Sequence, residues 1–328
     1  MKRTLLFGGF FVLLAAKTAY ATEPAKDDAA TPSDTKAPEE ASQPPASAPP
    51  PTAEKPKPAP KPPYSLPWQL RPVLPVSAIR LDSSFAIQDA AFSSAYLLTG
   101  SYRPIPELSI MARLAVTQNN PDKADAGAAF VNPAVGVTVG GTLVKYIRMS
   151  GFVGVTIPVG MGGGDEPDPA ILAARSSGVY TRCAMDNALF AVNDLTIFPG
   201  FDFAVVADKF TMQFELTLLE LIRVRGEAAQ PDEFKTNLTM GVHAGYYFIP
   251  QFSVGAELRH QRWLTTPAAV AANPALRNTT SFAVGPRGHF QLAETIWIHP
   301  GLAYTMGVDD PMLEKGYKII QVDIPVTF

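Results

Sequence analysis

The sequence predicts an all-β fold: an antiparallel up-and-down transmembrane β-barrel of about 12 strands, preceded by a disordered proline-rich arm. Three observations predict it. The chain begins with a segment typical of an export signal. From Trp68 onward, apolar residues alternate with polar or small ones, which is the period of a strand. The predicted strands are long enough for a tilted membrane crossing, and tight turns alternate with longer loops.

The first residues have the parts of a signal peptide. Lys2-Arg3 is positively charged, and residues 4–16 form an apolar run of about 13 residues, too short for a membrane-spanning helix. Ala19-Tyr20-Ala21 fits the small-x-small cleavage pattern. We therefore predict a signal peptide over residues 1–21. Lys17, close behind the apolar run, leaves an uncleaved inner-membrane anchor as the alternative.

Residues 22–67 are predicted to be a periplasmic linker. They are rich in proline, alanine, lysine and serine and almost free of branched or aromatic side chains. Such a segment cannot bury enough apolar surface to offset its ordering entropy, so we expect an extended, solvated arm. Its run EKPKPAPKPP, residues 54–63, resembles the proline-lysine spacers of periplasm-crossing proteins. This resemblance implies peptidoglycan or a periplasmic protein as partner; a passive spacer is the alternative.

The barrel is predicted over residues 68–328. Its expected strands centre on 76–88, 91–103, 107–118, 130–145, 150–160, 195–206, 210–225, 234–248, 251–264, 279–292, 296–307 and 317–328. The longest loop, residues 161–194, is far longer than an ordinary hairpin loop. We expect part of it to fold over or into the barrel mouth, with a single helical turn at residues 170–175.

The last predicted strand shows the two faces most clearly. Lys318, Ile320, Val322, Ile324, Val326 and Phe328 share one face, and Ile319, Gln321, Asp323, Pro325 and Thr327 share the other. In a membrane barrel the apolar face contacts lipid and the polar face lines the lumen. Aromatic residues beside the tight turns are expected to form an interfacial girdle; they are Tyr102, Tyr146, Phe210, Tyr247, Phe248, Phe252 and Trp297.

The same alternation predicts the lumen-lining residues. They are Arg80, Asp82, Arg113, Asp202, Gln213, Glu215, His243, Glu257, Arg259, Arg287, His289, Gln291 and Asp323. Charges of both signs occur among them. They are interpreted either as ion pairs that fill and rigidify a narrow barrel or as a polar conduit that orients a solute.

A terminal Phe328 preceded by alternating apolar residues resembles the recognition end of bacterial outer-membrane barrels, which their assembly machinery reads. The resemblance implies a Gram-negative outer membrane, with lipid and lipopolysaccharide around the barrel and the N-terminal arm in the periplasm. The size and hairpin rhythm also resemble small twelve-strand transporter barrels of the aromatic-compound uptake type.

Several kinds of chemistry are not expected. A net charge of −3 with 47% hydrophobic residues does not indicate nucleic-acid binding. Outer-membrane phospholipase and lipid A deacylase place a histidine two residues before a serine, and none of the four histidines here matches. A nucleophile needs a base within hydrogen-bond reach, so no catalytic residue is assigned. No metal site and no cofactor is assigned, and Cys183 is the only cysteine, so no intrachain disulfide forms.

The predicted function is a non-catalytic outer-membrane channel or small-solute transporter with a polar lumen. No plug-sized domain precedes the barrel and no globular domain follows Phe328, so neither an energised receptor nor a barrel with an added peptidoglycan-binding module is expected. The alternative is a structural or tethering barrel with a closed lumen that acts through its periplasmic arm.

Overall fold

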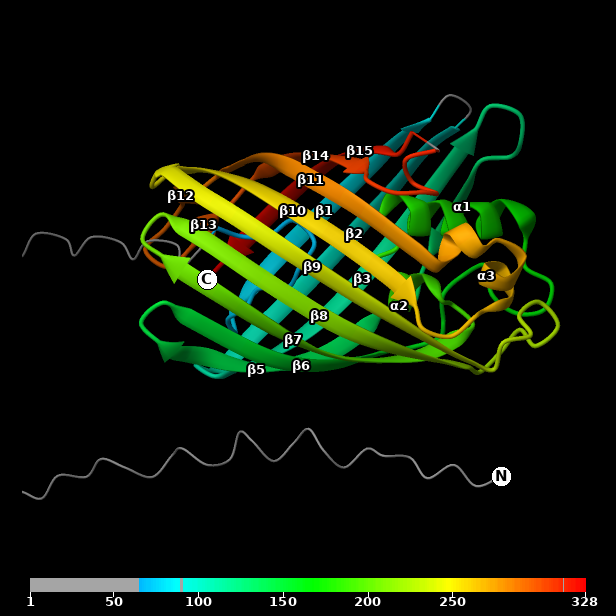
Figure 1. The fold of residues 1–328 in the computed structure, drawn as a ribbon, viewed down its shortest axis with the longest axis horizontal. Coiled ribbons are helices and arrows are strands. Elements are labelled where there is room, and N and C mark those ends of the chain that lie inside the picture. The colour runs from blue at the N-terminus through cyan, green and yellow to red at the C-terminus, as the bar shows by residue number, and fades with distance from the viewer. Residues whose placement is uncertain (1–64, 89–90, 315) are drawn as a thin grey trace, which may run out of the picture. The chain divides into compact units, whose positions relative to one another are not determined.

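The alternating segments close into a barrel in the computed structural model, which describes residues 65–88, 91–314 and 316–328 (Figure 1). Within this part of the chain, twelve antiparallel strands form the wall, and β1 pairs with β15 to close it. The predicted strand number is confirmed. The wall strands are β1 (Ala78–Gln88), β2 (Ala91–Ile105), β3 (Leu108–Pro121), β5 (Ala134–Val144), β6 (Ile147–Thr156), β7 (Asp194–Ala207), β8 (Phe210–Arg223), β9 (Phe234–Ile249), β10 (Phe252–Trp263), β11 (Asn278–Gly288), β14 (Gly301–Gly307) and β15 (Lys318–Thr327).

Short strands and helices lie at the two ends of the wall. β4 (Gly127–Phe130) pairs with β3, while β12 (Phe290–Gln291) and β13 (Trp297–Ile298) extend the connection from β11 to β14. The helices are α1 (Pro169–Thr181), α2 (Asn187–Phe190), α3 (Ala268–Ala272) and the 3₁₀ helix η1 (Pro274–Arg277). Figure 1 shows α1, α2 and α3 at the end of the barrel opposite the C-terminus. Among the described residues, no helix is both long and apolar enough to cross a bilayer.

Helix α1 corrects the expectation of one helical turn at residues 170–175, because it has 13 residues. Asp168 caps it by accepting hydrogen bonds from the backbone N–H groups of Ala170 and Ile171, and Pro169 opens its first turn. These are favoured residue types at a helix start. The helix packs closely on β3 and β4: a Cβ added at Gly178 would lie 2.4 Å from the Thr117 methyl group.

The two ends of the barrel differ as the sequence predicts. Tight turns join β2 to β3, β5 to β6, β7 to β8 and β9 to β10 at the end that holds the C-terminus, which we call the turn end. Long connections lie at the opposite, loop end, and the longest runs from β6 to β7 and carries α1 and α2. Since outer-membrane barrels have short periplasmic turns and longer external loops, the turn end corresponds to their periplasmic side.

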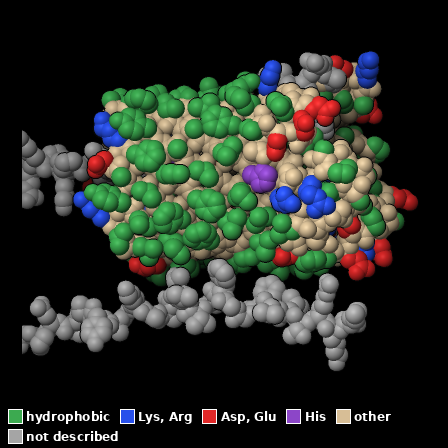
Figure 2. Space-filling view, viewed as in Figure 1, with side chains coloured by type: hydrophobic (Ala, Val, Ile, Leu, Met, Phe, Trp, Pro, Cys, Tyr) green, Lys and Arg blue, Asp and Glu red, His purple; other side chains and the backbone are tan. Residues whose placement is uncertain are grey.

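The outer face of the wall is apolar. Figure 2 shows hydrophobic side chains over most of the wall on the face in view, with charged side chains gathered toward the ends. On β15, Ile319, Gln321 and Asp323 are buried inside while Ile320 is 40% exposed outside, so the predicted faces of this strand are confirmed. An apolar surface of this extent is stable in contact with lipid hydrocarbon.

The aromatic residues predicted beside the tight turns divide into two groups. Tyr102, Tyr146, Phe210, Phe248 and Phe252 are exposed on the outer surface, as a girdle at headgroup level requires. Tyr247 departs from that prediction, because it is partly buried with its ring centroid 4.7 Å from that of His289, on the inner face. Trp297 is partly buried and stacks with His299.

The assignment of faces predicts the effect of a charge on the lipid side. Val322→Asp is expected to destabilise the barrel by roughly 2–4 kcal/mol at most, somewhat less than Arg or Lys would. Because this cost depends on depth, Val326→Asp on the same face of β15, nearer the turn end, is the matched control and is expected to cost less. Guanidinium unfolding in lipid vesicles measures both. An equal, negligible effect of the two variants would contradict the face assignment.

Candidate functional site: a filled barrel interior

Residues 65–77 do not belong to the wall but lie inside it, and we call them the inner segment. Its sequence, SLPWQLRPVLPVS, has prolines at 67, 72 and 75, which lack the N–H donor that a strand ladder needs. Ser65, Pro67, Trp68, Leu70 and Val73 are buried. Residues 65–67, placed in the arm by the sequence analysis, belong to this segment, and the first wall strand begins at Ala78.

Carboxylates of the wall hold the backbone of the inner segment. The backbone N–H of Trp68 donates to Glu257 Oε2 at 2.7 Å, and that of Gln69 donates to Glu257 Oε1 at 3.0 Å. The backbone N–H of Arg71 donates to Glu215 Oε2 at 2.6 Å. These are charge-assisted hydrogen bonds, which are stronger than bonds between neutral groups. Two predicted lumen carboxylates thus bind a segment of the chain itself.

Two cationic side chains add to this attachment. Arg71 pairs with Glu215 at 2.5 Å, and its guanidinium lies 4.1 Å from the centroid of the Phe152 ring. Arg287 of the wall lies over the Trp68 ring at 4.3 Å. Such cation–π contacts contribute most where water is excluded, as it is around the buried Trp68.

Wall glycines leave the space that the inner segment occupies. A Cβ added at Gly241 would lie 2.3 Å from Leu70, and one at Gly301 would lie 2.5 Å from the Trp68 ring. A Cβ at Gly245 would lie 2.2 Å from the Ser65 hydroxyl oxygen. Any larger residue at these three positions would displace the segment, so the inner surface of the wall is shaped around it.

The long loop enters the barrel from the other end. Buried Arg182, which follows α1, donates to Asp82 Oδ2 at 2.7 Å and to Asp186 Oδ2 at 2.9 Å. Asp186 also accepts from Arg113 at 2.7 Å. Burial disfavours the charged form of Asp186, but Arg113 and Arg182 outweigh it and hold its pKa below the ordinary value. The prediction that part of this loop folds into the mouth is confirmed.

Most of the predicted lumen residues meet in one polar network. Asp323 accepts from Arg80 at 2.8 Å and from Arg287 at 2.5 Å. Arg259 pairs with Glu257 at 2.6 Å. Gln321, which shares the predicted polar face of β15 with Asp323, links two parts of this network: its amide nitrogen donates to Asp82 and its oxygen accepts from Arg259.

The remaining predicted lumen residues lie elsewhere in the barrel. Gln213 and Asp202 are fully buried and bonded to each other at 3.0 Å, beside Glu215 in the β7–β8 register. His243 is buried and 3.4 Å from the Ser65 hydroxyl. His289 is buried at the turn end, with its Nδ1 atom 2.9 Å from Nδ1 of His299.

Gln291 corrects the lumen prediction. It is exposed in the short strand β12, beyond the end of β11, and its amide donates to the backbone carbonyl of Glu294. The alternation was extended through residues 279–292 as one strand, but β11 ends at Gly288. The inside-outside pattern therefore does not apply to Gln291.

The sequence pattern missed several interior residues, among them Arg71, Arg182 and Asp186. Each of these three lies outside a wall strand, so period-2 alternation does not identify it. Arg71 had one available signal, since it is the only charge in the otherwise apolar and proline-rich stretch 65–77. A lone charge there needs an opposite partner, and Glu215 provides it.

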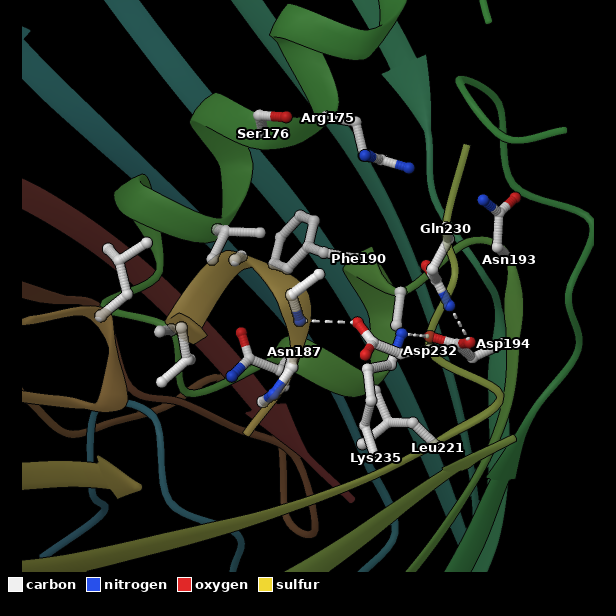
Figure 3. A pocket seen from close by; sticks show the side chains of 18 of the residues that line it. Arg175, Ser176, Asn187, Phe190, Asn193, Asp194, Leu221, Gln230, Asp232 and Lys235 are labelled. Carbon is white, nitrogen blue, oxygen red and sulfur yellow. Dashed lines mark hydrogen bonds and ion pairs between the residues drawn. The ribbon is translucent and has the colours of Figure 1, made fainter. Parts of the chain in front are cut away.

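The inserted segments leave little space between them. A cavity of about 20 Å³ is lined by Arg71 of the inner segment and Leu189 of the long loop. A larger cavity of about 560 Å³ lies at the loop end (Figure 3). Within the described residues, no group of three or more His, Cys, Asp or Glu side chains is placed to hold a metal ion. The barrel interior in this structure is packed with polar side chains and with the chain's own segments.

Solved structures with the same fold are outer-membrane barrels. The COG4313 outer-membrane channel from Pseudomonas putida F1 matches at a TM-score of 0.51 and 12% identity, covering 80% of this chain and 98% of that one. The KdgM porin matches at 0.43 and 9%, covering 76% and 99%, and the NanC porin at 0.44 and 8%, covering 76% and 98%. No protein-family model and no curated protein matches the chain. The chain thus has the twelve-strand fold of outer-membrane barrels.

Proposed function

We propose that this protein is a small-solute transporter of the Gram-negative outer membrane, closed in this structure by the inner segment and the long loop. The observation that carries the proposal is the kind of contact that holds these segments. Glu215, Glu257 and Asp82 bind them through ion pairs and hydrogen bonds. Buried ion pairs contribute little net stability compared with apolar packing of the same volume. An interior that only needs filling is therefore better served by apolar residues.

A polar interior is accounted for if it fills with water and forms a channel when the segments move. Once they are displaced, Asp82, Glu215 and Glu257 on the wall would be hydrated and would line a lumen of mixed charge. The fold of the COG4313 outer-membrane channel supports this proposal at the level of architecture. The turn end would face the periplasm, so the inner segment would close the periplasmic side and the long loop the external side.

The first test measures conductance through purified, refolded protein in planar bilayers. Deleting residues 163–177, which removes most of α1, is expected to raise single-channel conductance or opening frequency relative to the intact chain. The reason is that α1 occupies the loop-end mouth, whereas the anchoring Arg182 lies outside the deletion. A deletion of residues 122–126, in the loop between β3 and β4 and outside the loop-end cavity, is the control.

A structural barrel that acts through its N-terminal arm is the second candidate. The close fit of Gly241, Gly245 and Gly301 around the inner segment favours it, since a fit of this kind keeps the segment in place. This candidate predicts no conductance from the intact chain, from the loop deletion or from a variant with a weakened inner segment. Such a result would overturn the transporter proposal.

A further inference from the structure

The cavity at the loop end has the size of a small-molecule site. Its volume of about 560 Å³ lies within the range of roughly 300–1,000 Å³ that ligand pockets occupy. Its lining comes from α1, from the segment around α2, from the ends of β8 and β10, and from α3. Elements distant in sequence thus meet around one space at the mouth that a solute from outside reaches first.

The walls of this cavity are mainly apolar and partly aromatic. Its apolar lining includes Leu172, Val179, Phe190, Leu221, Trp263 and Met312. Phe190, Leu221 and Met312 are buried, so they form a fixed surface rather than mobile tips. Apolar walls with a few placed polar groups are typical of sites that bind small organic molecules.

The two carboxylates of the cavity already have partners. Asp194 accepts from Lys235 at 2.7 Å and from Gln230 at 2.6 Å, and Asp232 accepts from the backbone N–H of Ala268 at 2.9 Å. Figure 3 shows these contacts as dashed lines. The positive charge of Lys235 is therefore neutralised by Asp194 and does not attract a further anion strongly.

Arg175 is the cation of this cavity that lacks an ion-pair partner among the described residues. It donates one hydrogen bond, from Nη1 to the backbone carbonyl of Gly162 at 2.9 Å. Figure 3 shows it leaving α1 with no dashed line to any side chain drawn. Burial lowers its pKa, with Asp194 opposing and Arg225 adding to the effect. Burial thus disfavours the charged form of Arg175. A bound anion would stabilise that form.

We infer that the loop-end cavity binds a small organic molecule with an apolar, aromatic body and one anionic group, and that Arg175 pairs with that group. A guanidinium can hold a carboxylate through two parallel hydrogen bonds, which fixes the orientation of the ligand as well as its charge. The apolar walls take the body of the molecule. The inference rests on the proposed function, for which it names the class of solute.

The test uses two ligands that differ in one group, 2-naphthoate and 2-naphthalenemethanol, titrated calorimetrically into the refolded full chain in detergent. The carboxylate is expected to bind at least about tenfold more tightly than the alcohol. Arg175→Gln is expected to abolish that difference, and Arg175→Lys to keep part of it. Arg262→Gln is the matched control, because Arg262 is exposed on β10 outside the cavity and the preference is expected to survive.

A third variant tests the apolar part of the site. Ser176 lies on α1 beside Arg175 and lines the cavity, and Ser176→Trp is expected to weaken binding of both ligands by filling the space. Heat-modifiable gel mobility verifies that each variant is folded. The inference is overturned if the alcohol binds as tightly as the carboxylate, or if Arg175→Gln leaves the preference unchanged.

A negative result in the binding test and a negative result in the conductance test are independent of each other. Calorimetry measures equilibrium binding in detergent and needs no passage through the barrel. Conductance without a preference for 2-naphthoate would overturn the inference alone. A preference for 2-naphthoate without conductance in any variant would overturn the transporter proposal and leave a binding site at the barrel mouth.

Discussion

Asp323→Asn is expected to destabilise the barrel by about 3–5 kcal/mol, the usual cost of removing one partner from a buried ion pair. Asp323 is fully buried and accepts from both Arg80 and Arg287. Loss of its charge leaves two guanidinium groups in the interior facing a neutral amide. The free energy of unfolding in guanidinium, measured in lipid vesicles, gives the effect directly.

Glu294→Gln is the control for this experiment. Glu294 is exposed at the turn end, and removing its charge is expected to change the free energy of unfolding by less than about 0.5 kcal/mol. If Asp323→Asn were as mild as this control, the ion pairs of the interior would not hold the barrel together. The packing of the inserted segments would then need another explanation.

Arg71→Ala is expected to release the inner segment. The variant loses the ion pair with Glu215 and the contact with the Phe152 ring, together worth roughly 3 kcal/mol. At 1.4 kcal/mol for each factor of ten, the displaced state becomes about a hundredfold more populated. Single-channel recordings are expected to show more frequent openings than the intact chain.

A labelling experiment reports the same displacement without a current. In a Cys183→Ser background, Leu70→Cys places the only thiol on the buried inner segment. Its reaction with a charged maleimide is expected to be faster when Arg71→Ala is added, and unchanged with Arg103→Ala, which is exposed at the turn end. Faster labelling without any change in conductance would favour the structural barrel over the transporter.

The wall strands of this barrel can be predicted from sequence because alternation and turn length are properties of short, continuous segments. Strand alternation on β15 assigns Asp323 to the interior and Val322 to the lipid face, and both positions agree with the structure. Turn lengths locate the two ends for the same reason. Where alternation is extended past the true end of a strand, as at Gln291 beyond β11, the prediction is wrong.

The contents of the barrel depend on contacts between residues far apart in the chain. Arg71 meets Glu215 at a separation of 144 residues, and Arg182 meets Asp82 at 100. Neither arginine belongs to a periodic segment, so its position follows only once the barrel is closed. Helix α1 was underestimated for a related reason, because its apolar residues do not form a single stripe; its capping residue Asp168 was the available signal.

The path of the inner segment determines how it responds to a mechanical load. It begins at Ser65, bonded to Thr211 next to one tight turn, and it returns to the turn end at Ser77, whose carbonyl accepts from Phe328. Its deepest contact, Arg71 with Glu215 and Thr217, lies between these two points. A force applied at Ser65 along the barrel axis would therefore act first on the contact with Thr211, nearest the turn end, and would reach Arg71 last. The ion pair of Arg71 with Glu215 is then the contact whose rupture frees the segment under a pull from the turn end.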